Sequence, residues 1–378
     1  MTDSIIELIH VTTDTTWFNE KKEKYLNSPN FKRFQKASGV NLEDLSSNNP
    51  NIKRKAQEEL IKKSIILNAI RTKIGDYFCP LVYTHEFGIV DPVPEHVLET
   101  DLMILEGDMC DSLRRRHNAL SYAMLPEIIS GLENELKRPL VIKNIGSGMG
   151  IDVLNALMEL GKTNDIGKYI QKNMNLDIDT GLLNFGIRIT NYLEGRNMIP
   201  QGLTSYANKN LFFSREKADL AVFIGYICST KDEFASRTLD FIRKTLNKGG
   251  QIVVSSSTYH MRNTDPLSSF LIQNLGLQED KEMGYPDDPL FGWPLNFRTK
   301  EQMKNVLKDA GYKDIKVYDD ANFPGRDSIE YKMISEVDCL PSIALGLKEK
   351  EYKPLKLPSK DILNKKIGYN WIAVARAN

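Results

Sequence analysis

The chain has few cysteines, and none of them has a metal-binding or redox spacing. Its 378 residues include only Cys79, Cys110, Cys228 and Cys339, and no two of these form a CxxC pair. We therefore expect reduced thiols, without a zinc site or a disulfide framework. His85 and His96 also lack partners at metal-ligand spacing, so the sequence predicts no metal site.

Long apolar runs and an excess of positive charge are also absent. The longest strongly apolar run, residues 220–228, is too short to span a bilayer. Lys plus Arg equal Asp plus Glu at 50 each, so no overall positive field favours a nucleic-acid partner. Met1 is not followed by a basic segment and a long apolar core, so we expect no secretory signal and a cytoplasmic protein.

The most informative segment is residues 139–150. An apolar stretch over residues 140–142 leads into Gly146-Ser147-Gly148-Met149-Gly150, and a helical apolar pattern begins directly afterwards. Glycines let the backbone turn sharply and approach a ligand closely, and a helix N-terminus presents free N–H groups to it. Strand, glycine-rich turn and helix in this order predict a nucleotide-cofactor site.

The spacing of the glycines separates the kinds of nucleotide site. A phosphate-binding P-loop needs Gly-Lys-Ser/Thr, but Gly150 is followed by Ile151-Asp152. A dinucleotide site needs G-x-G-x-x-G, and here Ile151 stands at the sixth position. The observed G-x-G-x-G resembles the first motif of the class I S-adenosylmethionine-dependent methyltransferases. A purely structural turn is the alternative for a lone motif, so the context decides.

Four later segments resemble the same family in order and spacing. Asp177 ends a second predicted strand, after a gap that needs a long first helix or an inserted turn near residues 161–166. Residues 218–225 predict a buried strand that ends in glycine. Residues 241–254 predict a helix, a Gly-Gly stop and a buried strand. Thr299 and Gln302 predict a capping box on a helix that stops at Gly311, before a strand at 315–318.

The resemblance covers residues 138–320 and a closing strand at 371–375. It implies an α/β, Rossmann-like class I methyltransferase fold: a mostly parallel seven-stranded sheet with helices on both faces, plus a mostly helical N-terminal region. We expect residues 1–137 to form that region, as a substrate cap or an interface, with helices over 53–76 and 113–135. Residues 138–378 would form the S-adenosylmethionine-binding domain, with an insert at about 321–369.

The resemblance also implies which residues bind the cofactor, S-adenosyl-L-methionine. They are Gly146, Ser147, Gly148 and Gly150 for the methionine part, Asp177 for the ribose, and Gly225 at the end of the fourth strand. The acidic residue that often stands two positions before the first glycine is replaced by Asn144, which brings no charge to the methionine ammonium. Tyr206 and Asn208 are the candidates for contact with the adenine.

Methyl transfer needs alignment of the acceptor more than acid–base chemistry, because the leaving group is already good. A base helps only an acceptor that carries a proton at neutral pH. His260 and Tyr226 are the candidate catalytic residues, with a structural histidine and a pocket wall as the alternative interpretations. An Asn-Pro-Pro-Tyr motif is absent after the fourth strand, which disfavours DNA, ribosome or release-factor substrates.

Residues Arg114-Arg115-Arg116-His117 form the densest basic cluster. Four consecutive helical residues spread around all faces, so they cannot all meet one ligand. A solvated helix face is the favoured interpretation. The alternative is that one of them reaches an anionic substrate or the cofactor carboxylate.

Together these features predict an S-adenosylmethionine-dependent methyltransferase for a small-molecule or lipid-like acceptor, at O, N or C. We expect no nucleic-acid partner and no membrane span, and a homodimer through the N-terminal region stays open. A protein or RNA methyltransferase is one alternative. The other is a non-catalytic partner protein with the methyltransferase fold.

Overall fold

A seven-stranded sheet forms the centre of the computed structural model, which describes residues 26–72, 82, 99–162, 165–258, 267–268, 270–271, 296–321 and 368–377. The strand order is β3-β2-β1-β4-β5-β7-β6. The strands are β1 (Leu140–Ile145), β2 (Ile170–Asp177), β3 (Thr204–Asn208), β4 (Ala218–Phe223), β5 (Leu246–Ser257), β6 (Lys313–Asp319) and β7 (Asn370–Arg376). Only β7 runs antiparallel to its neighbours. The predicted mostly parallel sheet is confirmed.

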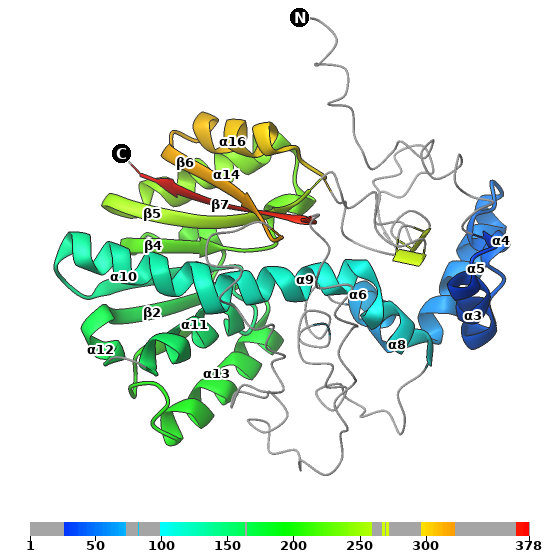
Figure 1. Ribbon diagram of the computed structural model, residues 1–378, viewed down its shortest axis with the longest axis horizontal. Helices are drawn as coiled ribbons and strands as arrows, with labels where there is room; N and C mark the ends of the chain where they lie inside the picture. The colour runs from blue at the N-terminus through cyan, green and yellow to red at the C-terminus, as the bar shows by residue number, and fades with distance from the viewer. Residues whose placement is uncertain are drawn as a thin grey trace, which may run out of the picture.

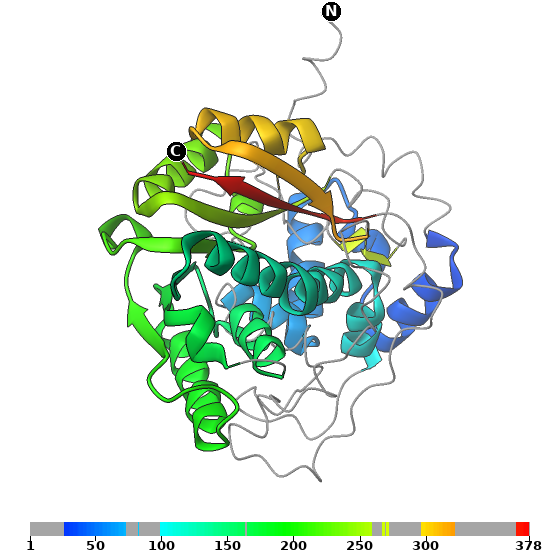
Figure 2. The ribbon, with the colours of Figure 1, turned by 60° about the vertical axis from the view of Figure 1, so that its left-hand side comes forward.

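Helices cover both faces of the sheet (Figures 1 and 2). One face is covered by α9 (Asp108–Ala119), η3 (Leu120–Met124), α10 (Leu125–Leu136), α11 (Ile151–Gly161), α12 (Ile166–Tyr169) and α13 (Thr180–Gly195). The other is covered by α14 (Asp232–Lys244) and α16 (Lys300–Asp309), with the short turns η4 (Leu211–Phe213) and η5 (Ile227–Ser229) in the connections around β4.

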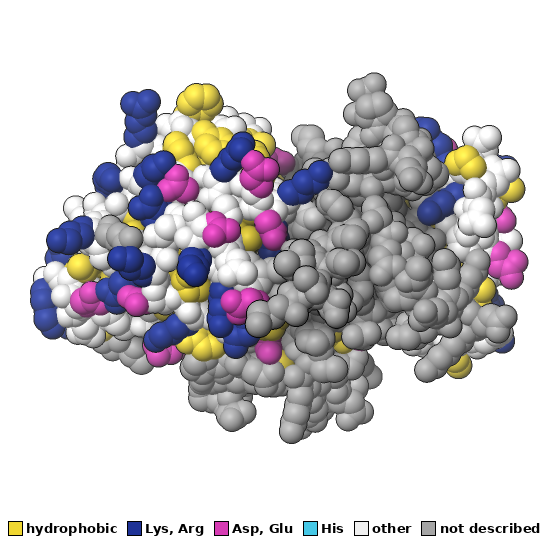
Figure 3. All heavy atoms as spheres, turned by 90° about the horizontal axis from the view of Figure 1, so that it is seen from above, with side chains coloured by type: hydrophobic (Ala, Val, Ile, Leu, Met, Phe, Trp, Pro, Cys, Tyr) yellow, Lys and Arg dark blue, Asp and Glu magenta, His cyan; other side chains and the backbone are white. Residues whose placement is uncertain are grey.

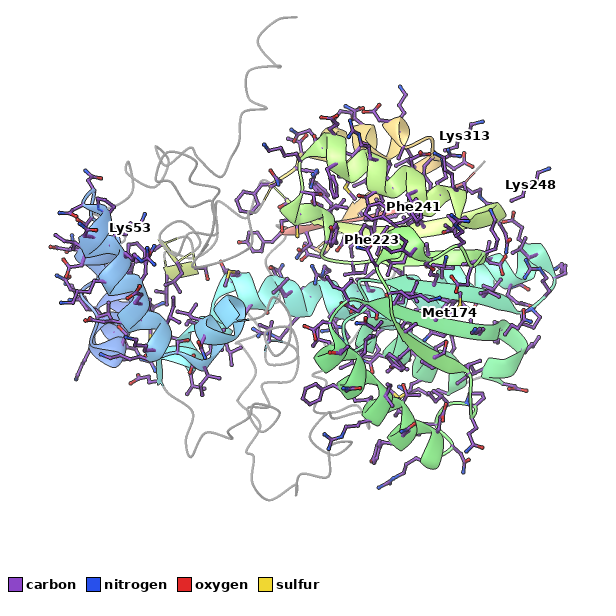
Figure 4. All side chains as sticks on the ribbon, turned by 180° about the vertical axis from the view of Figure 1, so that it is seen from behind. Lys53, Met174, Phe223, Phe241, Lys248 and Lys313 are labelled. Carbon is purple, nitrogen blue, oxygen red and sulfur yellow. The ribbon has the colours of Figure 1, made fainter. Side chains whose placement is uncertain are left out.

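Alternation along β4 builds a separate apolar layer on each face. Leu220 and Val222 belong to the layer under α11, whereas Ala221 and Phe223 belong to the layer under α14. Figure 4 labels Phe223 of β4, which belongs to the layer under α14, and Phe241 of α14. Both faces of β4 are buried, as the sequence predicted, and the strand is a continuous apolar run from Leu220 to Phe223.

The predicted capping box is present at the start of α16. The Thr299 hydroxyl accepts from the Gln302 N–H, and the Gln302 side chain accepts from the Thr299 N–H. In contrast, the prediction that Gly249-Gly250 stops a helix is wrong. α14 already ends at Lys244, and both glycines lie inside β5. A side chain at Gly250 would come within 2.9 Å of the Asp219 carbonyl, so the glycines mark an irregular stretch of strand.

The helix predicted over residues 53–76 is two helices as far as residue 72, α5 (Pro50–Lys62) and α6 (Ile65–Thr72), and residues 73–76 lie outside the described residues. The break follows from Ser64 and Asp101. The Ser64 hydroxyl accepts from the Leu67 N–H, and the Asp101 carboxylate accepts from the N–H groups of Ile65 and Ile66. These bonds satisfy the free donors at the start of α6, so a new helix begins there.

The remaining N-terminal helices are α3 (Pro29–Ser38), α4 (Leu42–Leu45) and α8 (Glu99–Glu106). Figure 1 shows α3, α4 and α5 beyond the carboxyl ends of the parallel strands, joined to the sheet through α8 and α9. The helical N-terminal region is confirmed within residues 26–72 and 99–136. The insert predicted at about 321–369 lies outside the described residues, apart from its ends at 321 and 368–369.

The predicted helix over residues 113–135 begins earlier, at Asp108, and runs through α9, the π-helical turn η3 and α10. The solvated face proposed for Arg114–His117 is wrong, because all four residues are buried. Tertiary partners replace water there: Arg114 donates to the carbonyls of Val82 and Leu105, and Arg115 lies 3.0 Å from the Asp111 carboxylate.

Surface charge agrees with the neutral composition. Figure 3 shows Lys and Arg side chains interspersed with Asp and Glu over the described part of one face. Within the described residues, no helix is long and apolar enough to cross a bilayer.

Candidate functional site

The glycine-rich loop joins β1 to α11 in a conformation that requires glycine. Gly146, Gly148 and Gly150 have φ angles of 59°, 52° and 75°, a region that side chains rarely adopt. The Gly150 N–H donates to the Ser147 carbonyl at 2.8 Å, which closes the turn. The Ser147 N–H donates to the Leu176 carbonyl at 3.1 Å, which ties the loop to β2.

Asp177, the last residue of β2, fixes the same loop through its side chain. Its Oδ2 accepts from the Gly148 N–H at 2.7 Å, and its Oδ1 accepts from the Asp179 N–H at 2.9 Å. Asp179 in turn caps α13 by accepting from the N–H groups of Gly181 and Leu182. An ionised carboxylate has about four acceptor positions. Asp177 can therefore hold the loop and still accept hydrogen bonds from a ligand.

A buried amide pair supports the loop from the sheet side. Asn144 of β1 donates from Nδ2 to Oδ1 of Asn175 at 2.9 Å, and both residues are buried. A side chain at Gly150 would come within 2.6 Å of that Oδ1. Asn144, which stands where the family often has an acid, therefore has Asn175 as its hydrogen-bond partner. The role of Asn175 was not predicted from the sequence. Asn175 stands two positions before Asp177, just as Asn144 stands two positions before Gly146.

The segment after β4 lies at the same edge of the sheet. Gly225, with φ of 80°, donates its N–H to the Ser255 hydroxyl at 3.0 Å. Tyr226 is 37% exposed, and the centre of its ring lies 5.1 Å from that of Phe223. The Cys228 thiol is buried and donates to the Gly225 carbonyl. Burial raises the pKa of this thiol, against the positive charges of Arg116 and Arg298, so it is not set up as a nucleophile.

Arg298 fixes the shape of this segment from within the protein. Its guanidinium, 1% exposed, donates to the carbonyls of Ile227 and Thr230, to the Ser256 hydroxyl and to the Asp232 carboxylate. These bonds join the turn after β4 to β5 and to the first turn of α14. No sequence pattern indicates this role, because the four partners, two of them backbone carbonyls, are distant in the chain.

The two residues predicted to contact adenine, Tyr206 and Asn208, have different hydrogen-bond partners. The Tyr206 hydroxyl bonds to Thr190 and to the Met149 carbonyl, so it joins β3, α13 and the glycine loop. Asn208 ends β3 and donates to the Ile178 carbonyl at 2.8 Å. Ile178 itself was not predicted as part of the site. It follows Asp177 directly, and 72% of it is exposed.

The structure brings most of the predicted site residues to the carboxyl ends of β1, β2 and β4. These are Gly146, Ser147, Gly148, Gly150, Asp177, Gly225 and Tyr226. His260 lies outside the described residues. Among the described residues, no group of three His, Cys, Asp or Glu side chains could hold a metal ion.

No protein-family model and no curated protein sequence matches the chain. Solved structures do match. A possible exported protein from Bordetella parapertussis is 14% identical and covers 93% of this chain and 99% of its own, with a TM-score of 0.50. Magnesium protoporphyrin IX methyltransferase from Synechocystis PCC 6803, solved with S-adenosylmethionine, is 10% identical over 82% of this chain and 97% of its own, with a TM-score of 0.40.

The identities are too low for these likenesses to show more than a fold. The fold is defined by the sheet itself: seven strands in the order β3-β2-β1-β4-β5-β7-β6, reversed only at β7, with a glycine-rich turn after β1 and a carboxylate at the end of β2. The chain therefore has the fold of the class I S-adenosylmethionine-dependent methyltransferases.

Proposed function

We propose that the chain is an S-adenosylmethionine-dependent methyltransferase that acts on a small-molecule or lipid-like acceptor, at O, N or C. The contact between Asp177 and the glycine loop supports this most directly, at 2.7 Å from the Gly148 N–H. It places a carboxylate acceptor beside a glycine-rich loop at the start of α11. A nucleoside with an amino-acid tail needs acceptors for its sugar hydroxyls and a backbone that it can approach closely.

The residues present fit S-adenosyl-L-methionine, which when bound would supply an activated methyl group on a sulfonium centre. Side chains added at Gly146 and Gly148 would meet other atoms no closer than 3.9 and 3.6 Å. The described chain therefore leaves room at both glycines for a ligand to approach the backbone. Gly146, Ser147 and Gly148 would bind the methionine part, and Asp177 the ribose hydroxyls.

Ile178 and Asn208 are our candidates for the adenine. An apolar side chain that is 72% exposed beside the ribose-binding carboxylate can cover one face of a base. Asn208 lies next to it, bonded to the Ile178 carbonyl. Of the two residues predicted from the sequence, Asn208 is the better candidate, since the Tyr206 hydroxyl is already engaged.

The acceptor would lie past Gly225 and Tyr226, toward the N-terminal region. We propose residues 1–137 as its cap and residues 138–378 as the cofactor-binding domain. Tyr226 would form an apolar wall, because transfer from a sulfonium centre depends on alignment and on exclusion of water. The role of His260 as a base stays a prediction.

Calorimetry with S-adenosylhomocysteine tests the cofactor assignment. Asp177→Ala removes the acceptor of the ribose hydroxyls. Hydrogen bonds to a charged group contribute about 1.5–3 kcal/mol, so affinity should fall by roughly tenfold to a hundredfold. Asp179→Asn is the matched control. It removes a carboxylate two residues after Asp177, and asparagine can still cap α13. Equal affinity of Asp177→Ala and the parent protein would remove the assignment.

Labelled S-adenosylmethionine separates the kinds of acceptor. The protein is incubated with the methyl-labelled cofactor and a cell extract that has been split into small-molecule, lipid, protein and RNA fractions. Label in the small-molecule or lipid fraction supports the proposal. Label in protein or RNA supports the macromolecular alternative. Absence of binding of either form of the cofactor supports a non-catalytic partner protein.

A further inference from the structure

The single turn η4, between β3 and β4, exposes two adjacent phenylalanines. Phe213 is 78% exposed and Phe212 is 39% exposed. The turn is held by Asn210, whose side chain accepts from the Phe212 N–H and whose carbonyl accepts from the Phe213 N–H, each at 3.0 Å. Hydrogen bonds therefore fix two apolar rings at the surface, where their contact with water is unfavourable.

These two rings continue an aromatic surface on α14. The centre of the Phe212 ring lies 5.2 Å from that of Phe241, which is labelled in Figure 4, and the two rings meet edge to face. Phe234 stands seven residues before Phe241, so it lies on the same side of α14, and it is 44% exposed. Isolated exposed apolar residues need no explanation, whereas a group of them marks an interaction surface. We call this group the aromatic patch: Phe212, Phe213, Phe234 and Phe241.

The side chains beside the aromatic patch carry an excess of positive charge. Lys217 reaches α14, where its ammonium donates to the Lys244 carbonyl at 2.7 Å, so the two segments lie together. Glu216 pairs with Lys209 at 2.8 Å. Asp240 pairs with Lys244 at 2.6 Å. The charged side chains of residues 209–217 and 240–244 form what we call the basic rim: Lys209, Arg215, Lys217, Arg243 and Lys244, against Glu216 and Asp240. The chain as a whole is neutral, so this local excess favours an anionic partner at the patch.

An anionic lipid surface fits this combination better than a second copy of the chain or a nucleic acid does. In a symmetric dimer the basic rim would meet itself, so like charges would face one another. Single-stranded nucleic acid stacks its bases on aromatic side chains within a basic groove, whereas Phe213, at 78% exposed, stands out from the surface. Aromatic rings beside Lys and Arg are typical of segments that enter the headgroup region of a membrane.

We propose that the aromatic patch docks the protein on an anionic lipid surface. Phe212 and Phe213 enter the headgroup region, and the basic rim lies against the lipid phosphates. The Lys209 N–H donates to the Asp177 carbonyl at 3.0 Å, so the segment that carries both rings starts at the edge of the sheet that holds the candidate site. Docking goes beyond the proposed function and does not depend on methyl transfer.

Flotation of the full-length protein with lipid vesicles tests this docking. Vesicles of phosphatidylcholine alone are compared with vesicles of phosphatidylcholine and phosphatidylserine, and the partition coefficient is measured for each. Phe213→Ala removes the most exposed ring, Phe213→Trp keeps an aromatic anchor, and Arg215→Gln removes one positive charge of the rim. Ile187→Ala on α13 and Arg54→Gln on α5 are the matched controls, because each changes an exposed side chain of the same kind away from the patch.

The parent protein should bind the anionic vesicles more strongly than the neutral ones, and added salt should weaken this binding because it screens the basic rim. Phe213→Ala should lower the partition coefficient about tenfold, since the burial of one phenylalanine ring is lost, and Phe213→Trp should keep it. Arg215→Gln should lower it about fivefold. Both controls should bind as the parent protein does, and urea denaturation checks that each variant is folded.

Absence of vesicle binding, equal binding to both kinds of vesicle, or anionic binding that Phe213→Ala and Arg215→Gln leave unchanged overturns the proposal. Two further assays then identify the occupant. Binding of a labelled oligouridylate that needs Phe213 assigns the patch to nucleic acid. Self-association that needs Phe213, measured by analytical ultracentrifugation, assigns it to a second copy. The affinity for S-adenosylhomocysteine is measured separately, so a failure of the proposed function leaves the vesicle result unaffected.

Discussion

Replacing Gly150 with alanine separates two costs that the glycine avoids. The first is conformational, because φ is 75° at this position. A left-handed conformation costs an L-residue about 1–2 kcal/mol, and the lower entropy of unfolded alanine returns about 0.4–1 kcal/mol. The second is steric: the new Cβ would lie 2.6 Å from Oδ1 of Asn175, which is buried and bonded to Asn144.

The steric cost of the added methyl group at Gly150 is estimated separately from the conformational cost. Overpacking in a well-packed interior costs about 1–3 kcal/mol. Gly150→Ala should therefore destabilise the protein by about 2–4 kcal/mol. Gly202→Ala is the matched control, because its φ is 72° and nothing lies within 4 Å of the added Cβ. That control should lose only the conformational part, about 1 kcal/mol.

A double-mutant cycle with Asn175→Ala isolates the collision. The single change Asn175→Ala leaves the Asn144 amide without its partner, at a cost of about 1–3 kcal/mol. In the double mutant the added methyl group has room, so the two effects should fall short of additive by about 1–2 kcal/mol. Urea denaturation measures all four proteins. Equal losses for Gly150→Ala and Gly202→Ala, or an additive cycle, would refute the reasoning.

Three further predictions concern stability. Burial lowers the pKa of Lys143 from 10.5 to about 8, so between these pH values the unfolded chain binds more protons than the folded one. The free energy of unfolding should therefore rise with pH over this range, by at most about 3 kcal/mol. Urea denaturation of Lys143→Met should show no such rise. Burial alone would raise the pKa of Asp219, but bonds from Arg138, Val141 and Asn247 hold it below its usual value. The stabilisation from Asp219 is therefore present above its unfolded pKa and lost as the pH falls, and Asp219→Asn should cost about 3 kcal/mol near neutrality and flatten the acid limb. Thr299→Ala should lower the free energy of unfolding by about 1 kcal/mol and Thr299→Ser by much less, because serine keeps the cap; equal losses would contradict the capping box.

The sheet and the cofactor motif could be predicted because their signals are local. A strand buried on both faces needs a continuous apolar run, and Leu220–Phe223 within β4 supplies one. Positive φ angles favour glycine, and the three positive φ angles of the loop fall at Gly146, Gly148 and Gly150. Thr299 and Gln302 form their cap within one helical turn. In each case the residues that explain the structure are neighbours in the chain.

The errors arose where the deciding partner is distant. Gly249 and Gly250 look like a helix stop until the Asp219 carbonyl of β4 shows why a side chain is excluded there. The polar sequence of α9 is typical of a solvated helix. Its arginines are buried only because partners such as the Leu105 carbonyl and the Tyr369 ring lie against them. No pattern along α9 itself contains that information.

The site is formed before any ligand arrives, because each of its loops is tied to a neighbouring strand. The Gly148 N–H is bonded to Asp177 of β2, and the Gly225 N–H is bonded to Ser255 of β5. Arg298 donates two hydrogen bonds to the segment after β4 and ties it to Ser256 of β5 and Asp232 of α14. Ordering costs on binding should then be small at the cofactor end. In the enzyme that we propose, we therefore expect selectivity for the acceptor to come from residues past Gly225 and not from the glycine loop.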